Sequence, residues 1–422
     1  MIKYFELRTL SSVVSHDSSS EMVHFCRHCN AELVHEVIDL GHQPPSNAYL
    51  KQEELALPEL TYPLKVYICT HCWLMQVPAH AKAEELFTDD YAYFSGTSSS
   101  WCQHAFDFVQ EAVRRLELNQ NSFVLELASN DGYLLQYVKS KQIPCLGIEP
   151  TRATADAAIS LGIETLVEFF NSQLAEKLPQ ADLIIANNVL AHVPDINDFM
   201  SGIQKVLKQN GLVSIEFPHL LNLLKGNQFD TIYHEHFSYL SLHSVQRIAE
   251  SVGLIVVDVQ QLPTHGGSLR VWLGHPECSF STTDAVDQLL AEEREQGLES
   301  LAAYEKFENS ALQAKLELYQ FLSKSKLAGE TVLGYGAAAK GNTLLNYCGI
   351  KPDLLPFIVD RALSKQSKFM PGSHIPILSP EKIEEIKPDK ILVLPWNLLD
   401  EIAKLLPGYN LYTAIPSLKK RS

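Results

Sequence analysis

The chain lacks the features that mark several large classes of protein. None of its apolar runs approaches the ~20 residues that cross a membrane as a helix. The N-terminus is rich in serine and mixed in charge, without the basic-then-apolar order of a secretory signal. We therefore expect a disordered tail over residues 1–21, a cytoplasmic location and no membrane partner.

Basic residues are also in short supply. The 34 Lys and Arg residues face 50 Asp and Glu residues, which gives a formal net charge of −16. Nucleic acids and anionic membranes are bound by basic surfaces, so this balance argues against both as partners. A small anionic ligand held in a locally basic pocket is compatible with it. The 422 residues suffice for two or three domains.

Cysteine is scarce, but its spacing is informative. Eight cysteines are too few for a disulfide scaffold in a chain of this length. Four of them form the pairs Cys26-x-x-Cys29 and Cys69-x-x-Cys72, which together can close one tetrahedral structural zinc site. The histidines inside the pairs are expected to be bystanders, and the stretch between the pairs should carry structure of its own. The alternative is two unrelated buried pairs.

Strand-like and helix-like patterns alternate in two stretches, 100–275 and 330–415. Between them lies a charged stretch without proline, 283–329, with leucines at helical spacing. This alternation predicts two α/β units, each with a parallel sheet.

In the first unit, two predicted strands carry carboxylates near their ends. Strand 122–128 leads into the loop Ser129-Asn-Asp-Gly132 and a helix over 133–139, and strand 145–149 ends in an acid that suits a ribose diol. The loop lacks the Gly-x-Gly-x-x-Gly of a pyrophosphate site. S-adenosylmethionine has no phosphate and does not require that motif. An ordinary α/β crossover with polar loop ends is the alternative.

The candidate cofactor-binding residues lie in this loop, beside it, or at the ends of neighbouring strands. We expect them to hold S-adenosylmethionine. They are Glu126, Ser129, Asn130, Asp131, Gly132, Glu149, Pro150, Glu168, Phe169, Asn187 and Asn188.

Three motifs together are more specific than any one of them: the loop motif over 126–132, the run Ala-Asn-Asn-Val-Leu-Ala-His-Val-Pro-Asp over 186–195, and Tyr-His-Glu-His-Phe-Ser-Tyr over 233–239. In these residues the chain resembles the sugar C-methyltransferase family, in order over residues ~24–415. That family transfers a methyl group from S-adenosylmethionine to a carbon of nucleotide-linked 4-keto deoxysugars.

The resemblance implies an α/β protein of three parts: a small N-terminal zinc-binding domain, a class I methyltransferase Rossmann-like domain and a C-terminal Rossmann-like unit. The expected boundaries are 22–85 for the zinc-binding domain, 86–280 for the methyltransferase domain, 281–329 for a helical connector and 330–422 for the nucleotide-sugar-binding unit.

The stretch 233–239 offers a base and hydrogen-bond partners within four residues. Methylation at carbon needs removal of a proton next to a ketone and stabilisation of the enolate oxygen. The resemblance makes His236 the base, with Tyr233 or His192 facing the enolate oxygen and Glu235 orienting the histidine or a sugar hydroxyl. His234-x-His236 as a metal pair, or as part of an ordinary surface, is the alternative.

Two further segments are expected to contact the substrate. The resemblance implies that a segment rich in tyrosine and serine covers the cofactor and contacts the substrate, with Tyr91 and Tyr93 as the candidates. A packed aromatic connector is the alternative. Gly334-x-Gly336-x-x-Ala339 follows a predicted strand and fits a dinucleotide fingerprint, with Asp360 closing the next strand. Gly336, Lys340, Asn342 and Asp360 are candidates for holding the pyrophosphate of a nucleotide-sugar. A glycine-rich turn kept for packing is the alternative.

Other functions stay open at this stage. One base near a sulfonium also suits O- or N-methylation of a sugar. The C-terminal fingerprint alone would suit an NAD(P)-dependent nucleotide-sugar enzyme, and a zinc-stabilised scaffold without catalysis is a third reading. We expect a monomer or a dimer that acts on a small molecule.

Overall fold

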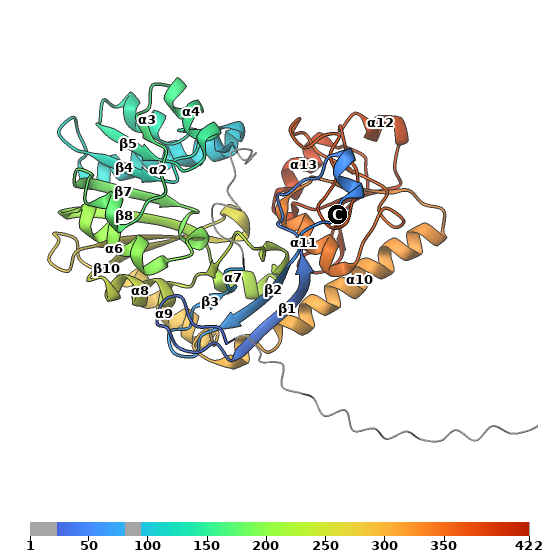
Figure 1. Cartoon of the computed structure of the whole chain (residues 1–422), viewed down its shortest axis with the longest axis horizontal. Coiled ribbons are helices and arrows are strands. Elements are labelled where there is room, and N and C mark those ends of the chain that lie inside the picture. Colours follow the sequence, from blue (N-terminus) through green and yellow to red (C-terminus); the bar gives the residue numbers. More distant parts are fainter. Residues whose placement is uncertain (1–22, 81–93, 422) are drawn as a thin grey trace, which may run out of the picture.

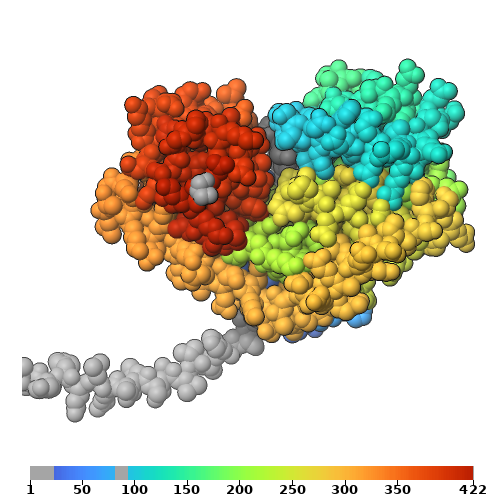
Figure 2. All heavy atoms as spheres, turned by 180° about the vertical axis from the view of Figure 1, so that it is seen from behind, coloured from blue at the N-terminus to red at the C-terminus, as the bar shows by residue number. Residues whose placement is uncertain are grey.

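The computed structural model describes residues 23–80 and 94–421, in three sheets (Figure 1). The tail expected over 1–21 lies outside the described residues. The methyltransferase-like unit and the C-terminal unit lie side by side, and Figure 2 shows them from behind as two masses. Within the described residues, no helix combines the length and apolarity needed to cross a membrane.

The N-terminal sheet has four antiparallel strands in the order β1-β2-β3-β9. β1 (His35–Gln43) and β2 (Tyr62–Ile68) form a long hairpin, and η1 (Gln52–Ala56) lies in their connection. β3 (Met75–Gln76) follows the second cysteine pair. β9 (Ser238–Tyr239) comes from the middle of the chain. The stretch between the cysteine pairs thus carries structure, as predicted.

The central sheet has seven strands in the order β10-β11-β8-β7-β4-β5-β6. Among the described strands of this sheet, β11 runs opposite to the rest, so the predicted parallel sheet is wrong at this strand. The link from β10 to β11 is a short turn, η5 (Thr264–Gly266), which has no room for the crossover helix that parallel strands need. The strands are β4 (Val124–Leu127), β5 (Cys145–Ile148), β6 (Thr165–Leu166), β7 (Ala181–Asn187), β8 (Leu207–Pro218), β10 (Ile255–Leu262) and β11 (Ser268–Gly274).

Helices cover both faces of the central sheet because its strands are apolar on both sides. On one face, Phe108 of α2 and Leu135 of α3 pack with Trp272 of β11. On the other, Phe199 of α6 and Val245 of α8 join a second core. The helices are α2 (Ser99–Leu116), α3 (Leu135–Ser140), α4 (Arg152–Ser160), α5 (Ser172–Ala175), α6 (Ile196–Val206), α7 (Leu220–Lys225) and α8 (Leu242–Ser251).

The connector predicted as helical contains α9 (Asp284–Glu295), η6 (Leu301–Ala303) and α10 (Phe307–Leu327). α10 runs along the lower edge of the C-terminal unit in Figure 1. Its buried face shares one core with the β1–β2 hairpin and with helix α11 (Ala339–Cys348). The hairpin therefore packs against the C-terminal part of the chain as well as within its own sheet.

The C-terminal sheet has six strands in the order β14-β13-β12-β15-β16-β17, parallel except for β17 at the edge. The strands are β12 (Val332–Tyr335), β13 (Ile358–Val359), β14 (Ile377–Leu378), β15 (Lys390–Val393), β16 (Leu411–Thr413) and β17 (Lys419–Lys420). The helices are α11 (Ala339–Cys348), α12 (Lys382–Ile386) and α13 (Leu399–Leu405). This arrangement is the predicted Rossmann-like unit.

A buried hydrogen bond between Glu293 and His219 ties α9 to the central unit. Glu293 is 0% exposed, and its carboxylate lies 2.7 Å from Nε2 of His219. The same carboxylate accepts the backbone N–H groups of Leu242 and His243, at 2.7 and 2.9 Å, at the start of α8. One side chain thus satisfies two N–H groups that a helix N-terminus leaves without partners.

Glu293→Ala is expected to lower the free energy of unfolding by roughly 3 kcal/mol, because it strips three buried donors of their acceptor. Urea unfolding followed by fluorescence measures the change. Glu295→Ala is the matched control, since Glu295 is exposed on the same helix. Equal stabilities of the two variants would show that the buried pair has no such role.

Candidate active site and zinc centre

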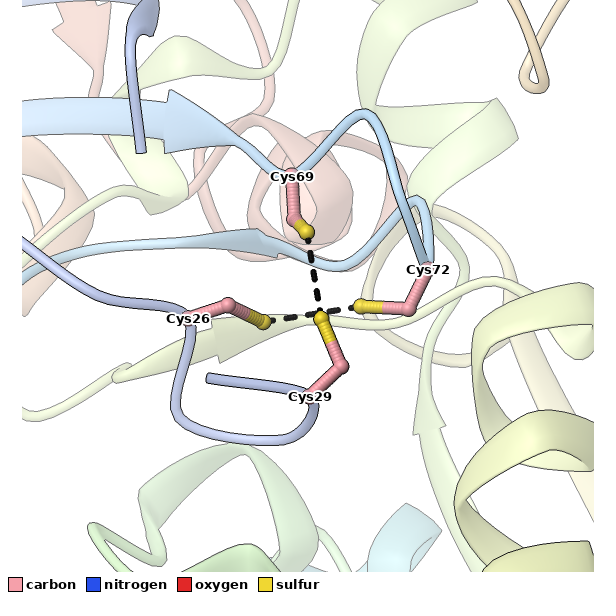
Figure 3. Close-up of side chains that lie close together, drawn as sticks. All are labelled: Cys26, Cys29, Cys69 and Cys72. Carbon is pink, nitrogen blue, oxygen red and sulfur yellow. Dashed lines mark hydrogen bonds between the residues drawn. The ribbon is translucent and has the colours of Figure 1, made fainter. Parts of the chain in front are cut away.

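The four predicted cysteine ligands converge on one point (Figure 3). Their sulfur atoms all lie within 4.8 Å of one another, and the pairs Cys26–Cys72 and Cys29–Cys69 are each separated by 3.5 Å. A tetrahedral Zn–S₄ centre needs sulfur atoms about 3.8 Å apart. The donor set therefore fits one zinc ion with no open position, which makes the site structural.

The first cysteine knuckle, residues 26–29, is held by hydrogen bonds from two neighbouring elements, β3 and α6. The Nε2 amide of Gln76, on β3, points at the sulfur of Cys26 at 3.2 Å. Inside the first knuckle, the backbone carbonyl of His28 accepts the Nδ2 amide of Asn197, on α6, at 2.8 Å. The histidine is thus a docking residue and lies outside the ligand set, as the sequence predicted.

The loop after β4 has the tight backbone that the sequence predicted. Ala128, Asn130 and Gly132 all have positive φ, at 54, 51 and 76°. A Cβ on Gly132 would lie 2.4 Å from the side chain of Ile163, so glycine is required there. The hydroxyl of Ser129 is buried and has no partner within the described chain.

Three carboxylates surround this loop. Glu149 accepts the N–H groups of Asn130 and Thr151, each at 2.9 Å, and so joins the ends of β4 and β5. Asp131 accepts the N–H of Gly96 at 2.9 Å. Glu126 is 1% exposed, and burial, followed by the charges of Glu149 and Asp131, raises its pKa well above 4.5.

The remaining cofactor candidates lie along the same edge of the sheet. Asn187 ends β7, and its buried Oδ1 has no partner among the described residues, while Asn188 follows with a φ of 53°. Pro150 directly follows Glu149. Glu168 and Phe169 lie beyond β6, at the edge of the sheet, and are exposed. Buried polar atoms without partners and a glycine-dependent loop at one edge fit a polar ligand such as S-adenosylmethionine.

His236 lies next to two of the other predicted catalytic residues. Its ring centroid is 4.0 Å from that of Tyr233 and 4.6 Å from that of His192. Its Nδ1 lies 3.0 Å from the carbonyl oxygen of Thr231. A carbonyl accepts only, so Nδ1 carries the hydrogen and Nε2 is the basic nitrogen. Burial, then the neighbouring histidine at 192, holds the pKa of His236 well below 6.5.

His192 has its tautomer fixed in the same way. Its Nδ1 donates to the backbone carbonyl of Glu235 at 2.7 Å, and burial lowers its pKa to about 4. The neutral ring therefore presents Nε2 as an acceptor, which cannot donate to an enolate oxygen. Of the two residues predicted for that oxygen, the geometry favours Tyr233.

The side chain of Glu235 points toward the N-terminal domain. It is 1% exposed, and its Oε1 accepts the Nδ2 amide of Asn47 at 3.2 Å. Its Oε2 is buried without a partner among the described residues, and burial raises its pKa. Sequence reasoning missed both Asn47 and its neighbour Tyr49, whose hydroxyl donates to the carbonyl of Ala337 at 2.6 Å. No local pattern marks either residue.

The glycine-rich turn of the C-terminal unit is held by its predicted acid. Asp360 accepts the N–H groups of Ala337 and Ala362, both at 2.7 Å. Gly336 has a φ of 88°, and a Cβ there would lie 2.6 Å from Pro395. Asn342 is fully buried with Asn346 as a partner at 3.2 Å, so its amide lies within the packing of α11.

Lys340 points toward the methyltransferase-like unit. Its Nζ donates to Oδ1 of Asn397 at 2.8 Å and lies 4.6 Å above the ring of Trp396. The indole N–H of Trp396 donates to Asp230 at 2.8 Å. Burial lowers the pKa of Lys340, while burial raises that of Asp230 to about 6. Sequence reasoning missed Asp230 and Trp396, because these two residues meet across two units.

The remaining substrate candidates, Tyr91 and Tyr93, lie outside the described residues. The metal pair proposed for His234-x-His236 finds no support, since among the described residues the cysteine cluster is the group that could hold an ion. His234 instead packs toward β2, with its Nε2 3.3 Å from the carbonyl of Tyr62.

Comparison with known proteins assigns the chain. Family models match a zinc binding domain over residues 26–87, a methyltransferase domain over 101–259 and a C-methyltransferase C-terminal domain over 263–411. C-methyltransferase NovU of Streptomyces niveus is 35% identical over 381 residues, 89% of this chain and 90% of that protein. The chain belongs to the C-methyltransferase family.

This C-methyltransferase also resembles solved structures over part of its length. Magnesium protoporphyrin IX methyltransferase of Synechocystis PCC 6803, solved with bound SAM, has a TM-score of 0.33 at 12% identity, covering 41% of this chain and 79% of its own. The PH0226 protein of Pyrococcus horikoshii OT3 has a TM-score of 0.37 at 15% identity, covering 44% and 95%.

The family assignment confirms the predicted enzyme class and cofactors. The C-methyltransferase is S-adenosylmethionine-dependent, and it has a structural zinc site in its N-terminal domain. The fold class predicted from the sequence is likewise confirmed.

Cys26→Ser is expected to remove bound zinc and to reduce methyl transfer at least tenfold, although no cysteine of the cluster belongs to the catalytic group. The reason is that β3, which begins three residues after Cys72, pairs with β9, which begins two residues after His236. Metal content by mass spectrometry and the transfer rate provide the measurement. Cys278→Ser, outside the cluster, should keep both, and a zinc-free variant with full activity would contradict the coupling.

Proposed function

We propose that this C-methyltransferase methylates a ring carbon next to the ketone of a nucleotide-linked keto-deoxysugar. The observation that carries the proposal is the tautomer of His236, whose Nδ1–H is committed to Thr231 and whose Nε2 is left basic beside a phenol. A base next to a donor is what enolate formation requires. The 35% identity to a C-methyltransferase supports transfer to carbon.

The residues divide the work as follows. Nε2 of His236 takes the proton from the carbon, and the hydroxyl of Tyr233 donates to the oxygen that becomes the enolate. Nε2 of His192 and the buried Oε2 of Glu235 accept hydrogen bonds from hydroxyl groups of the sugar. Bound S-adenosylmethionine would supply the electrophilic methyl group for the enolate carbon, with its S–CH₃ bond breaking and S-adenosylhomocysteine leaving. Holding the sugar and the methyl donor close together in the reactive orientation contributes much of the rate enhancement.

The C-terminal unit is proposed to hold the nucleotide part of the substrate. The turn at Gly336 leads into the N-terminus of α11, and Lys340 lies in the first turn of that helix and supplies a positive charge. A pyrophosphate suits both features. The location in the cytoplasm and the small-molecule nature of the substrate belong to the same proposal.

Hydrogen exchange separates transfer to carbon from transfer to oxygen or nitrogen. The purified enzyme is incubated in D₂O with S-adenosylhomocysteine and a panel of 4-keto nucleotide-sugars, and deuterium beside the ketone is followed by NMR. We expect exchange that His236→Ala slows by roughly 10²–10⁴-fold, the usual contribution of a general base. The same variant should bind S-adenosylhomocysteine unchanged.

His234→Gln is the matched control, because His234 faces β2 and not the other catalytic candidates. It should keep the exchange and the transfer reaction. Methyl transfer without any deuterium uptake would favour an O- or N-methyltransferase. Full exchange in His236→Ala would remove His236 from the role of base.

The pH dependence of kcat/KM follows from the same residue. The base works when neutral, and its pKa in the folded protein lies well below 6.5. Activity should therefore persist as the pH falls through 6.5 and decline only at more acid values. An acid limb centred at or above 6.5 would contradict a buried His236 as the base.

A further inference from the structure

The turn between β10 and β11 carries a histidine that the reaction proposed above does not use. His265 has φ 54° and ψ 21°, in the left-handed region that side chains rarely adopt. Gly266 and Gly267 follow with φ of 91° and 114°. Residues held in such conformations gather at functional sites, where the surroundings fix them.

The surroundings of this turn do fix it. The hydroxyl of Thr264 donates to Oε1 of Glu216 at 3.2 Å, and the carbonyl of Gly266 accepts the side-chain amide of Gln228 at 3.0 Å. A Cβ on Gly266 would lie 2.4 Å from the ring of Trp396, so the turn touches the C-terminal unit directly. The backbone is thus held from both units, and the direction of the Cα–Cβ bond of His265 is set.

Glu216 is itself fixed within a buried ionic cluster. It is 0% exposed, and its Oε2 lies 2.8 Å from Nη2 of Arg270 and 2.9 Å from Nε2 of His104. The same Arg270 lies over the ring of Phe108 at 4.5 Å. Charges buried in this way are rigid, because separating them would leave an unpaired charge without water.

The ring of His265 lies between the cofactor loop and the nucleotide-binding turn. It approaches Trp101 at 5.2 Å, and Trp101 stacks at 6.2 Å with Tyr133, the residue directly after the loop that ends at Gly132. On the other side, the neighbouring Gly266 touches Trp396, which lies beneath Lys340. With the nucleotide at the turn and the reacting carbon facing the methyl donor, the sugar of the proposed substrate would lie in this interval.

We propose that His265 binds the sugar ring of the substrate through a hydrogen bond to a hydroxyl and so helps to determine which sugar is accepted. The inference rests on the proposed function and adds a specificity residue to it. Burial, then the charge of Lys340, lowers the pKa of His265 to about 4. The neutral ring can both donate and accept, which suits a hydroxyl better than a phosphate.

Two substitutions separate binding from packing. His265→Gly removes the ring and keeps the left-handed backbone without strain, and His265→Asn tolerates this backbone and restores a donor and an acceptor. For a nucleotide-sugar that the wild type methylates, we expect the glycine variant to raise KM roughly tenfold, the effect of about 1.4 kcal/mol. Its kcat should change far less, and the asparagine variant should recover part of the loss.

S-adenosylhomocysteine binding by calorimetry and the unfolding temperature complete the test. Both should stay close to the wild-type values, because the ring contacts the sugar and the strain is relieved. An unchanged KM in both variants would overturn the role of His265. A rise in KM accompanied by a comparable loss of stability and of S-adenosylhomocysteine binding would also overturn it. If the wild type methylates no sugar of the panel, the proposed function fails first and this inference fails with it.

Discussion

The pairing of β3 with β9 is the constraint on which the site depends. β3 follows the second cysteine pair, and β9 follows the stretch that contains His236. The N–H of Val77 also donates to the carbonyl of Phe237 at 3.0 Å. A two-residue strand has little stability of its own. The cysteine cluster orders β3, and β3 orders the catalytic stretch through its pairing with β9.

Exclusion of water is the second physical constraint on the residues of the site. The two histidines at 192 and 236 each give Nδ1–H to a backbone carbonyl, and burial lowers both pKa values. In the same volume, burial raises the pKa of Glu235. Burial thus favours the uncharged form of each of these side chains. Such groups form strong hydrogen bonds to a polar ligand that replaces water.

The sequence predicted what depends on neighbours in the chain. The cysteine pairs, the loop that ends at Gly132 and the Gly336 turn are local patterns, and their chemistry is set by spacing. The reversed strand β11 was not predicted, since apolar runs look alike in both directions. Asn47, Asp230 and Trp396 were not predicted either. Each acquires its partner from a distant part of the chain, and no local spacing reveals such a meeting.

The domain plan from the sequence also treated the N-terminal part as separate. Leu50 pairs in both directions with Phe369, by backbone bonds of 3.0 and 2.8 Å, and Glu59 bonds to His374 at 2.9 Å. The segment between the cysteine pairs therefore bonds to the C-terminal unit. β3, which follows the second cysteine pair, pairs with β9 beside the catalytic stretch. The three parts follow one another along the chain, but the N-terminal part contacts both of the others. The contacts among the three parts therefore form a closed circle.

That circle limits how such enzymes can be recombined. The hydroxyl of Tyr49 reaches the carbonyl of Ala337, inside the turn that follows β12. A chimera that exchanged the C-terminal unit alone, to change the nucleotide it accepts, would bring a foreign turn against a native phenol. The segment around Tyr49 would have to travel with the transplanted unit, although almost three hundred positions of chain separate them.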